Sequence, residues 1–259
     1  MENQRHQSHC MVCGSMLDYQ ERAGTHACSF CGASKQGHAV CIQGHFVCDA
    51  CHGRDARQHI EEMAFTATDS DPMALAERML NLPNLPMLGC EHAFIACGAI
   101  LAALRNSPYG KDKITDAEIR EAFERTSAQG KGGFCALTGV CGVAPAVGAC
   151  VSLFLGSRCG SDSEQRITME SVIRVQQAIA ALTGPSCCKA YVRAALTEAS
   201  AIFSERFGIV LPVQNPVPQC RHSALHPHGC REEKCPYYDK PQQDIFASAQ
   251  FVPGTVCST

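Results

Sequence analysis

Closely spaced pairs of cysteine and histidine occupy the first sixty residues of the chain. Thiolate sulfur and imidazole nitrogen are the donors with which structural zinc is usually bound, and a short spacing places two of them on one turn. Mixed ligation of this kind favours zinc over iron. The sequence therefore predicts about two zinc ions here, with His38 and His52 as spare ligands. The pairs, in chain order, are Cys10/Cys13, Cys28/Cys31, Cys41/His45 and Cys48/Cys51.

The sequence leaves open how these four pairs share two ions. The first two pairs together have the spacing of a zinc ribbon, which would give two successive sites. The order of all four pairs also resembles a RING-like arrangement. In that arrangement the first and third pairs hold one zinc, and the second and fourth pairs hold the other.

A second set of cysteines lies at predicted helix starts further along the chain. The positive end of a helix stabilises thiolate, so we expect these cysteines to have lowered pKa values and to meet in one site. His92 would move protons there and Lys189 would hold an anionic substrate, although each is also compatible with a purely structural place. The cofactor-binding candidates are Cys90, Cys135, Cys141, Cys187 and Cys188, and the catalytic candidates are Cys90, His92, Cys187, Cys188 and Lys189.

Three more cysteines, Cys220, Cys230 and Cys235, predict a metal site near the carboxyl end. Cys235 is followed by proline, an ending typical of cysteine runs that bind iron–sulfur clusters. A fourth ligand is needed, and it would be His222 or a cysteine of the helical region. Two other cysteines, Cys97 and Cys150, lie in the middle of predicted helices and are expected to act as small buried hydrophobes.

The elements that must position these residues are predominantly helical. Helix-start and helix-stop signals predict helices over 71–80, 91–105, 115–128, 142–155, 168–184 and 187–207. Thr115 and Glu118 have the spacing of a capping box. We therefore expect a mainly α protein with three parts: a zinc-binding module over 1–62, a cysteine-rich helical domain over 66–211 and an irregular tail over 212–259.

One stretch of this helical domain, residues 132–157, contains no charged residue and is long enough to cross a membrane. It also contains six glycines and a proline, which keep its mean hydropathy modest. We expect a buried helix preceded by a loop. The sequence therefore predicts no membrane association.

Composition narrows the choice of partners and of compartment. The formal net charge is -3, which gives no clear nucleic-acid signal, so the expected partner is an unknown small molecule or protein. The first twenty residues lack the apolar run of a signal peptide. We therefore expect the nineteen cysteines to be thiols or metal ligands in the reducing cytoplasm.

Several short sequence motifs resemble those of a family of cysteine-rich bacterial and archaeal proteins that is known only as a domain of unknown function. The resemblance implies that the cysteines in these motifs form the site, and it implies no reaction. Ala136 stands where glycine is expected, so the loop there is expected to be built differently. The motifs are Gly89-Cys90-Glu91-His92, Gly139-x-Cys141-Gly142, Gly184-Pro185-Ser186-Cys187-Cys188-Lys189, Gly44-His45-Phe46-Val47-Cys48-Asp49-x-Cys51-His52 and Cys235-Pro236-Tyr237.

Two functions of different classes fit these features. The first is a metal-dependent enzyme that uses an iron–sulfur cluster or thiolates in redox or sulfur-transfer chemistry. The second is a non-catalytic zinc-finger adaptor or a metal or redox sensor. Substitution of the Cys187-Cys188 pair by serine separates them, because only the enzyme would lose turnover while keeping its fold.

Overall fold

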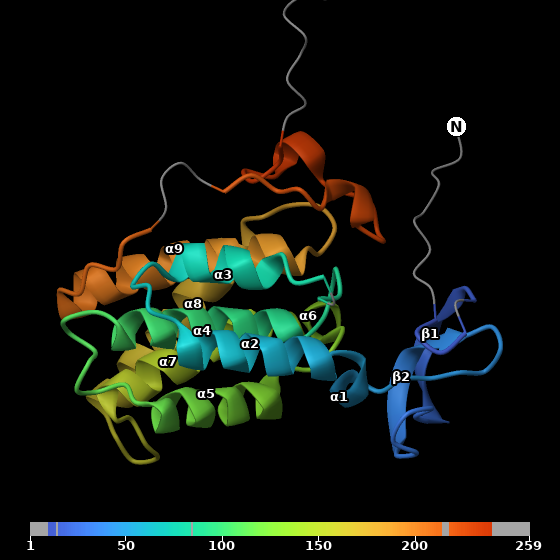
Figure 1. Cartoon of the computed structure of the whole chain (residues 1–259), viewed down its shortest axis with the longest axis horizontal. Helices are drawn as coiled ribbons and strands as arrows, with labels where there is room; N and C mark the ends of the chain where they lie inside the picture. Colours follow the sequence, from blue (N-terminus) through green and yellow to red (C-terminus); the bar gives the residue numbers. More distant parts are fainter. Residues whose placement is uncertain (1–9, 14, 84, 214–217, 240–259) are drawn as a thin grey trace, which may run out of the picture.

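A computed structural model of the chain describes residues 10–13, 15–83, 85–213 and 218–239. An antiparallel hairpin comes first, and a bundle of helices follows (Figure 1). The predicted mainly α fold with a small amino-terminal module is confirmed. The strands are β1 (Leu17–Ala27) and β2 (Ser34–Cys41). The helices are α1 (Asp49–His52), α2 (Arg54–Thr66), α3 (Pro72–Leu80), α4 (Glu91–Arg105), α5 (Asp116–Gln129), α6 (Phe134–Thr138), α7 (Val143–Leu155), α8 (Ser163–Ala180) and α9 (Cys188–Phe207).

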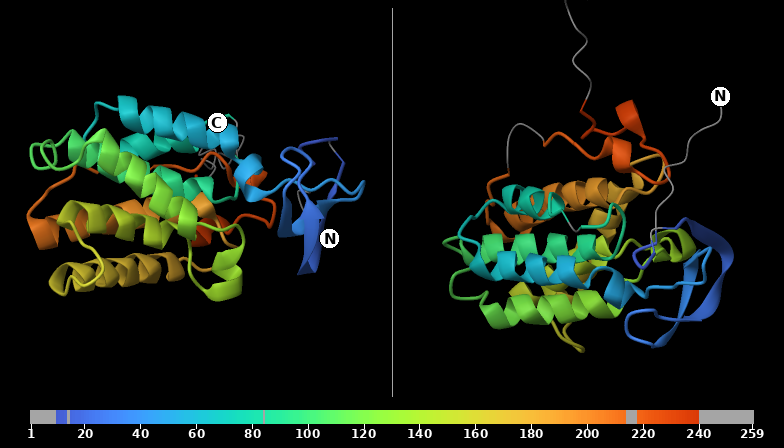
Figure 2. Two further views of the ribbon diagram at one scale, coloured as in Figure 1. Left: turned by 90° about the horizontal axis from the view of Figure 1, so that it is seen from below. Right: turned by 45° about the vertical axis from the view of Figure 1, so that its right-hand side comes forward.

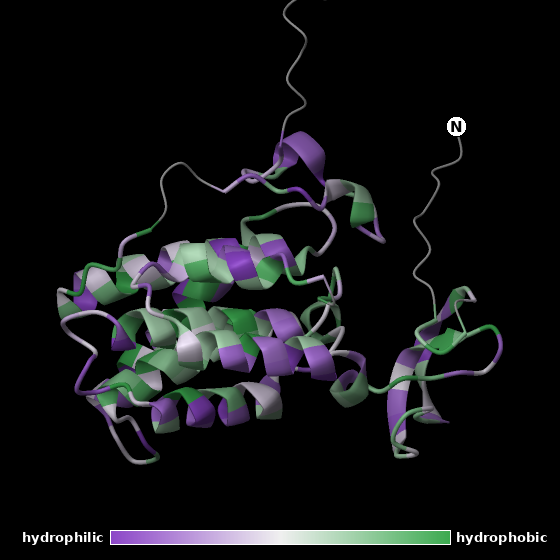
Figure 3. Ribbon diagram, in the orientation of Figure 1, coloured by the Kyte–Doolittle hydropathy of each residue, from purple (hydrophilic) through white to green (hydrophobic). Residues whose placement is uncertain are grey.

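Helix α4 is the centre of the bundle and is buried from Glu91 to Leu104. It packs against α2, α3, α5, α7 and α9. Small residues permit these close approaches: a Cβ on Gly98 would lie 3.0 Å from the Cζ of Phe123. Helices α2 and α5 carry hydrophilic residues on the side turned toward the viewer, whereas α4 is mainly apolar (Figure 3).

The uncharged stretch forms the short helix α6 and then α7, which packs between α4, α5 and α8. The predicted buried helix is present as α7, and the segment before it, which was expected to be a loop, contains the short helix α6. None of the helices in the described part of the chain combines the length and the apolar character needed to cross a membrane.

The hairpin module lies at one end of the bundle, where α1 and α2 connect it to the helical part (Figure 2). Helix α2 was not predicted, because only three of its residues, Ala56, Ile60 and Ala64, are fully buried and two of them are alanines. These three side chains, one on each turn, are buried against the core. The helix also runs through the boundary expected between 62 and 66, and that boundary stays a prediction. Helix α8 begins at Ser163, five residues before the predicted start at 168.

The described part of the tail folds back over the start of α9. Its chain forms two short 3₁₀ turns, η1 (Ser223–Leu225) and η2 (Glu232–Lys234). Cys220 and Tyr237 pack against Ala190 of α9, and the amide of Cys220 donates to the carbonyl of Tyr237 at 2.6 Å. The tail therefore packs against α9, the helix that begins with Cys188.

The predicted capping box of α5 is present and gives a first testable expectation. The Thr115 side chain accepts from the amide of Ala117 at 3.1 Å, and Glu118 accepts from the amide of Thr115 at 2.9 Å. Replacing Thr115 with alanine should lower the free energy of unfolding by about 1 kcal/mol. Urea unfolding measures this, with Ser127→Ala on an exposed position of the same helix as the control. Equal midpoints for the two variants would contradict the role of the cap.

Candidate metal centres

The first candidate centre is formed by Cys10, Cys13, Cys41 and His45, whose ligand atoms all lie within 4.8 Å of one another. Cys41 ends β2, and His45 lies in the turn that follows. The sulfurs of Cys13 and Cys41 are 3.5 Å apart, and the Nδ1 of His45 is 3.3 Å from the sulfur of Cys13. We call this set the first group.

The second group contains Cys28, Cys31, Cys48 and Cys51, and its sulfurs also lie within 4.8 Å of one another. Cys28 and Cys31 lie in the turn between the two strands, and Cys48 caps α1. The amide of Ser29 donates to the carbonyl of Phe46 at 2.7 Å, which holds the returning chain against that turn. The sulfurs of Cys31 and Cys48 are 3.8 Å apart.

The two groups use the four pairs in an interleaved order. The first and third pairs form the first group, and the second and fourth pairs form the second group. Of the two arrangements that the sequence left open, the structure has the RING-like one. The hairpin explains the order, because Leu17 pairs with Cys41 at one end of the strands and Ala27 pairs with Ser34 at the other. The chain after His45 then returns to the far end.

Amide groups point at the sulfurs of these centres. The amide two residues after Cys10 and the amide two residues after Cys41 donate to the respective sulfurs at 3.3 Å. The amide of Cys48 donates to the sulfur of Cys28 at 3.4 Å. A thiolate needs such donors once its charge is held inside a protein. The turns are therefore built to accept ligands in the deprotonated form.

The thiols of the module have divergent pKa values. Hydrogen bonds from Ser15 lower the pKa of Cys13 to about 6, and a hydrogen bond from the amide of Cys48 lowers the pKa of Cys28 to about 6. Burial raises the pKa of Cys41 and of Cys48, and it raises the pKa of Cys51 to about 12. A metal ion would have to displace the remaining protons as it binds.

Three of the helical-domain cysteines lie near one another. The sulfur of Cys188 accepts from the amide of Gly89, and its pKa is influenced by the neighbouring thiols of Cys141 and Cys135. Cys90 has different charged neighbours, namely Asp49, Glu91 and Arg57. The structure thus brings the starts of α4, α7 and α9 together, but the neighbours that influence Cys90 are charged side chains and not the other thiols.

Four of the helix-start cysteines have pKa values that run opposite to the sequence expectation, which is therefore wrong for these four. Burial raises the pKa of Cys90 to about 12 and that of Cys141 to about 11. It also raises the pKa of Cys187 and of Cys188. The free-energy cost of removing these thiolates from water is therefore larger than the stabilisation that a helix N-terminus provides. Without a bound metal, these groups are thiols at neutral pH.

Lys189 and His92 are both buried in the helical domain. The ammonium of Lys189 donates to the carbonyl of Leu80 at 2.6 Å, and burial lowers its pKa to about 8. The Nδ1 of His92 donates to the carbonyl of Gly89 at 3.1 Å, and burial lowers the pKa of this ring to about 3. The Nε2 of His92 has no hydrogen-bond partner among the residues that the structure describes. His92 is therefore neutral, with one free nitrogen lone pair.

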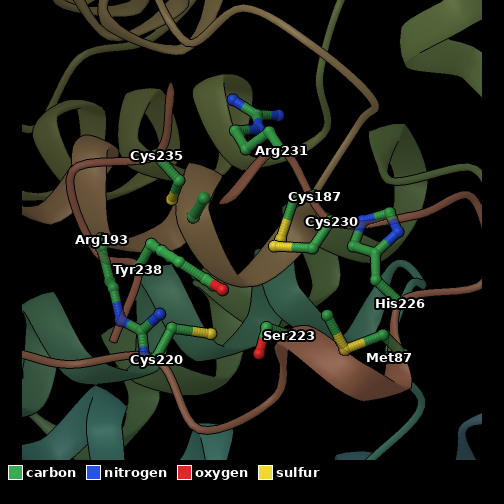
Figure 4. Close-up of a pocket in the computed structure, with 11 residues that line it drawn as sticks. Met87, Cys187, Arg193, Cys220, Ser223, His226, Cys230, Arg231, Cys235 and Tyr238 are labelled. Atoms are coloured by element: carbon green, nitrogen blue, oxygen red, sulfur yellow. The ribbon is translucent and has the colours of Figure 1, made fainter. Parts of the chain in front are cut away.

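Cys187 turns away from Cys188 and joins the cysteines of the tail. Cys187, Cys220, Cys230 and Cys235 line one cavity (Figure 4), and we call them the carboxy-terminal cluster. Sequence reasoning expected the fourth residue to be His222 or a cysteine of the helical region, and the structure places Cys187 there. His222 instead lies near Lys189 and Arg193, and burial lowers its pKa to about 4.

Two arginines beside this cluster were not among the site residues predicted from the sequence. Arg193 and Arg231 line the same cavity, and both are buried. Arg193 lies one helical turn after Lys189. Two cations on an otherwise apolar helix face are therefore the sequence feature that could have identified Arg193. Arg231 follows Cys230 directly and carried no such periodic signal.

Comparison with known proteins connects most of the chain to one family. The model of a family of unknown function (DUF5714) matches residues 60–238. The expected resemblance to a cysteine-rich family of unknown function is thereby confirmed. Neither the curated proteins nor the solved structures contain a significant match to the chain. The matched range includes the carboxy-terminal cluster and begins after both groups of the hairpin module.

Proposed function

The chain belongs to this family of unknown function, and from that premise we propose that it is a metal-dependent cysteine-rich protein whose amino-terminal module holds two zinc ions. The observation that carries the proposal is the convergence of the first and second groups, each with four ligand atoms within 4.8 Å. Such convergence of residues up to 35 positions apart needs a bound group to offset the crowding of thiols.

The spacing within the two groups supports zinc as the ion. Tetrahedral zinc with bonds of about 2.3 Å to sulfur sets the ligands about 3.8 Å apart. The separations of 3.5 Å in the first group and 3.8 Å in the second group match this value. The histidine in the first group also favours zinc over iron.

Elemental analysis of the purified full chain tests the zinc proposal. We expect about two zinc ions per chain, and about one in each of the variants Cys13→Ser and Cys31→Ser, because each removes a ligand from one group. Cys159→Ser is the matched control, because Cys159 is exposed and belongs to neither group. Wild-type protein without zinc would refute the proposal.

For the helical domain we propose an enzymatic role in redox or sulfur-transfer chemistry, carried by metal-bound thiolates. The nearness of Cys135 and Cys141 to Cys188 supports this proposal, since all three cysteines lie near helix starts. All eighteen cysteines that the structure describes are free, which fits a reducing compartment, and the cytoplasm is part of the proposal.

One observation favours the alternative of a non-catalytic zinc-finger adaptor or sensor. Several apolar side chains of the hairpin module are exposed, among them Tyr19, Phe30 and Ile42. A panel of redox and sulfur-transfer assays separates the two functions. Turnover that disappears in Cys188→Ser while the helical circular dichroism is retained supports the enzyme. A zinc-loaded wild type that shows no turnover supports the adaptor.

A further inference from the structure

The carboxy-terminal cluster gathers four cysteines from two distant parts of the chain. Cys187 caps α9, and Cys220, Cys230 and Cys235 come from the tail that folds over this helix. All four line one cavity, and Figure 4 shows them grouped around a common space.

The backbone around this cluster repeats a feature of the two zinc groups. The amide of His222 donates to the sulfur of Cys220 at 3.5 Å, and the amide of Glu232 donates to the sulfur of Cys230 at 3.3 Å. Both donors lie two residues after the cysteine, as they do at Cys10 and Cys41. Glu232 itself has a φ of 49°, in the left-handed region that residues other than glycine rarely adopt. Strain of this kind persists where a site needs it.

Buried positive charge surrounds the four sulfurs. Arg231 lines the cavity and is 7% exposed, and its Nε and Nη1 have no hydrogen-bond partner within the described residues. Arg193 lines the cavity too, with its guanidinium paired to Glu77, and Lys189 lies near Cys187 and Cys220. Buried donors without partners are costly, so their position indicates a negatively charged group in the space that they face.

From these contacts we propose that Cys187, Cys220, Cys230 and Cys235 ligate an iron–sulfur cluster. The inference rests on the proposed metal-dependent function and deepens it by naming the ligands. Four thiolates around an inorganic core carry net negative charge, which the neighbouring arginines and the start of α9 would stabilise.

The spread of the sulfurs distinguishes this cluster from a zinc site. In each zinc group all ligand atoms lie within 4.8 Å, but within the described chain no three sulfurs of the carboxy-terminal cluster meet that limit. A single zinc ion needs sulfurs about 3.8 Å apart. An iron–sulfur cluster spreads its ligands over several iron atoms, so its cysteines stand further from one another around a central space.

The test uses the full chain, purified anaerobically and reconstituted with ferrous iron and sulfide. We expect iron, acid-labile sulfide and a broad visible charge-transfer absorption in addition to about two zinc ions. Cys230→Ser and Cys235→Ser should lose most of the iron and sulfide and keep the zinc, whereas Cys159→Ser should keep all three. Cys31→Ser should lose zinc and keep iron, which separates a failure of the zinc proposal from a failure of this one.

Two results would overturn the inference. One is a wild-type protein without iron and sulfide after reconstitution, a measurement that does not depend on any variant folding. The other is a third zinc ion, in place of iron, that disappears in Cys230→Ser. Circular dichroism of each variant shows whether a loss of iron results from unfolding of the helices. If a variant does unfold, Mössbauer spectra of the wild type test the inference instead.

Discussion

Removing the two proposed zinc ions should unfold the hairpin module, whose described residues are 10–13 and 15–52, and leave the helical bundle folded. The apolar core of the module is minimal and consists of Cys28, Val40, Phe46 and Cys48, with Cys51 packed against it. Most side chains of β1 are exposed. Burial on this scale cannot offset the conformational entropy of about forty ordered residues, so the metal must supply the difference.

The expected size of this effect is large. Structural zinc binds zinc-finger peptides with about 10–16 kcal/mol at neutral pH, and that binding energy is also folding energy. Two ions therefore account for more stability than a small module possesses without them. The bundle has its own core around α4, which includes no residue of the first or the second group. We expect its stability to change little.

Hydrogen exchange with mass spectrometric detection measures both parts in one experiment. After chelation, peptides from β1 and β2 should exchange at the rate of an unstructured chain, and peptides from α4 should remain protected. Cys28→Ser should show partial loss of protection in the module even with zinc present, whereas Cys159→Ser should match the wild type. Unchanged protection in a sample proven to be free of zinc would show that the hairpin folds by itself.

The sequence was sufficient for the features that depend on local spacing. The four cysteine and histidine pairs, the capping box at Thr115 and most helix limits follow from residues within a few positions of one another. Helix α2 was missed because three small or medium apolar residues make a weak periodic signal. The interleaved order was also open, because it depends on how the hairpin returns the chain after His45.

The helix-start cysteines show a different limit. Cys187 and Cys188 are adjacent in sequence, but successive residues at a helix start point in different directions. Cys187 joins the tail cysteines, and Cys188 faces Gly89 and Cys141. The direction of their pKa shifts was also unpredictable from sequence, since it depends on burial that only the assembled bundle produces.

Breaking the ion pair between Arg193 and Glu77 should destabilise the helical domain more than any other single charge removal that we consider. The guanidinium donates from Nε and Nη2 to the two carboxylate oxygens at 2.6 and 2.8 Å. The side chain of Arg193 is 1% exposed and that of Glu77 is 17% exposed. The pair joins α9 to α3, two helices that pack together.

Replacing Glu77 with leucine leaves the buried guanidinium without its carboxylate. Removal of one partner of a buried pair costs about 3–5 kcal/mol, because the remaining charge stays out of water. For a domain of this size, that loss lowers the melting temperature by about 10 °C. Differential scanning calorimetry measures the shift. Glu170→Leu is the matched control, because Glu170 pairs with Arg206 at 2.7 Å on the surface, where an ion pair contributes at most about 1 kcal/mol.

A double variant decides whether the loss arises from the unpaired charge. Glu77→Leu combined with Arg193→Met removes both charges and fills the space with apolar atoms, a replacement that is often neutral or stabilising. We therefore expect the double variant to melt above the single variant Glu77→Leu. Equal melting temperatures for the two would show that the lost stability comes from packing between α3 and α9 and not from an uncompensated cation. A Glu77→Leu variant that melts like Glu170→Leu would show that the guanidinium finds another partner, for which the sulfur of Cys220 is one candidate.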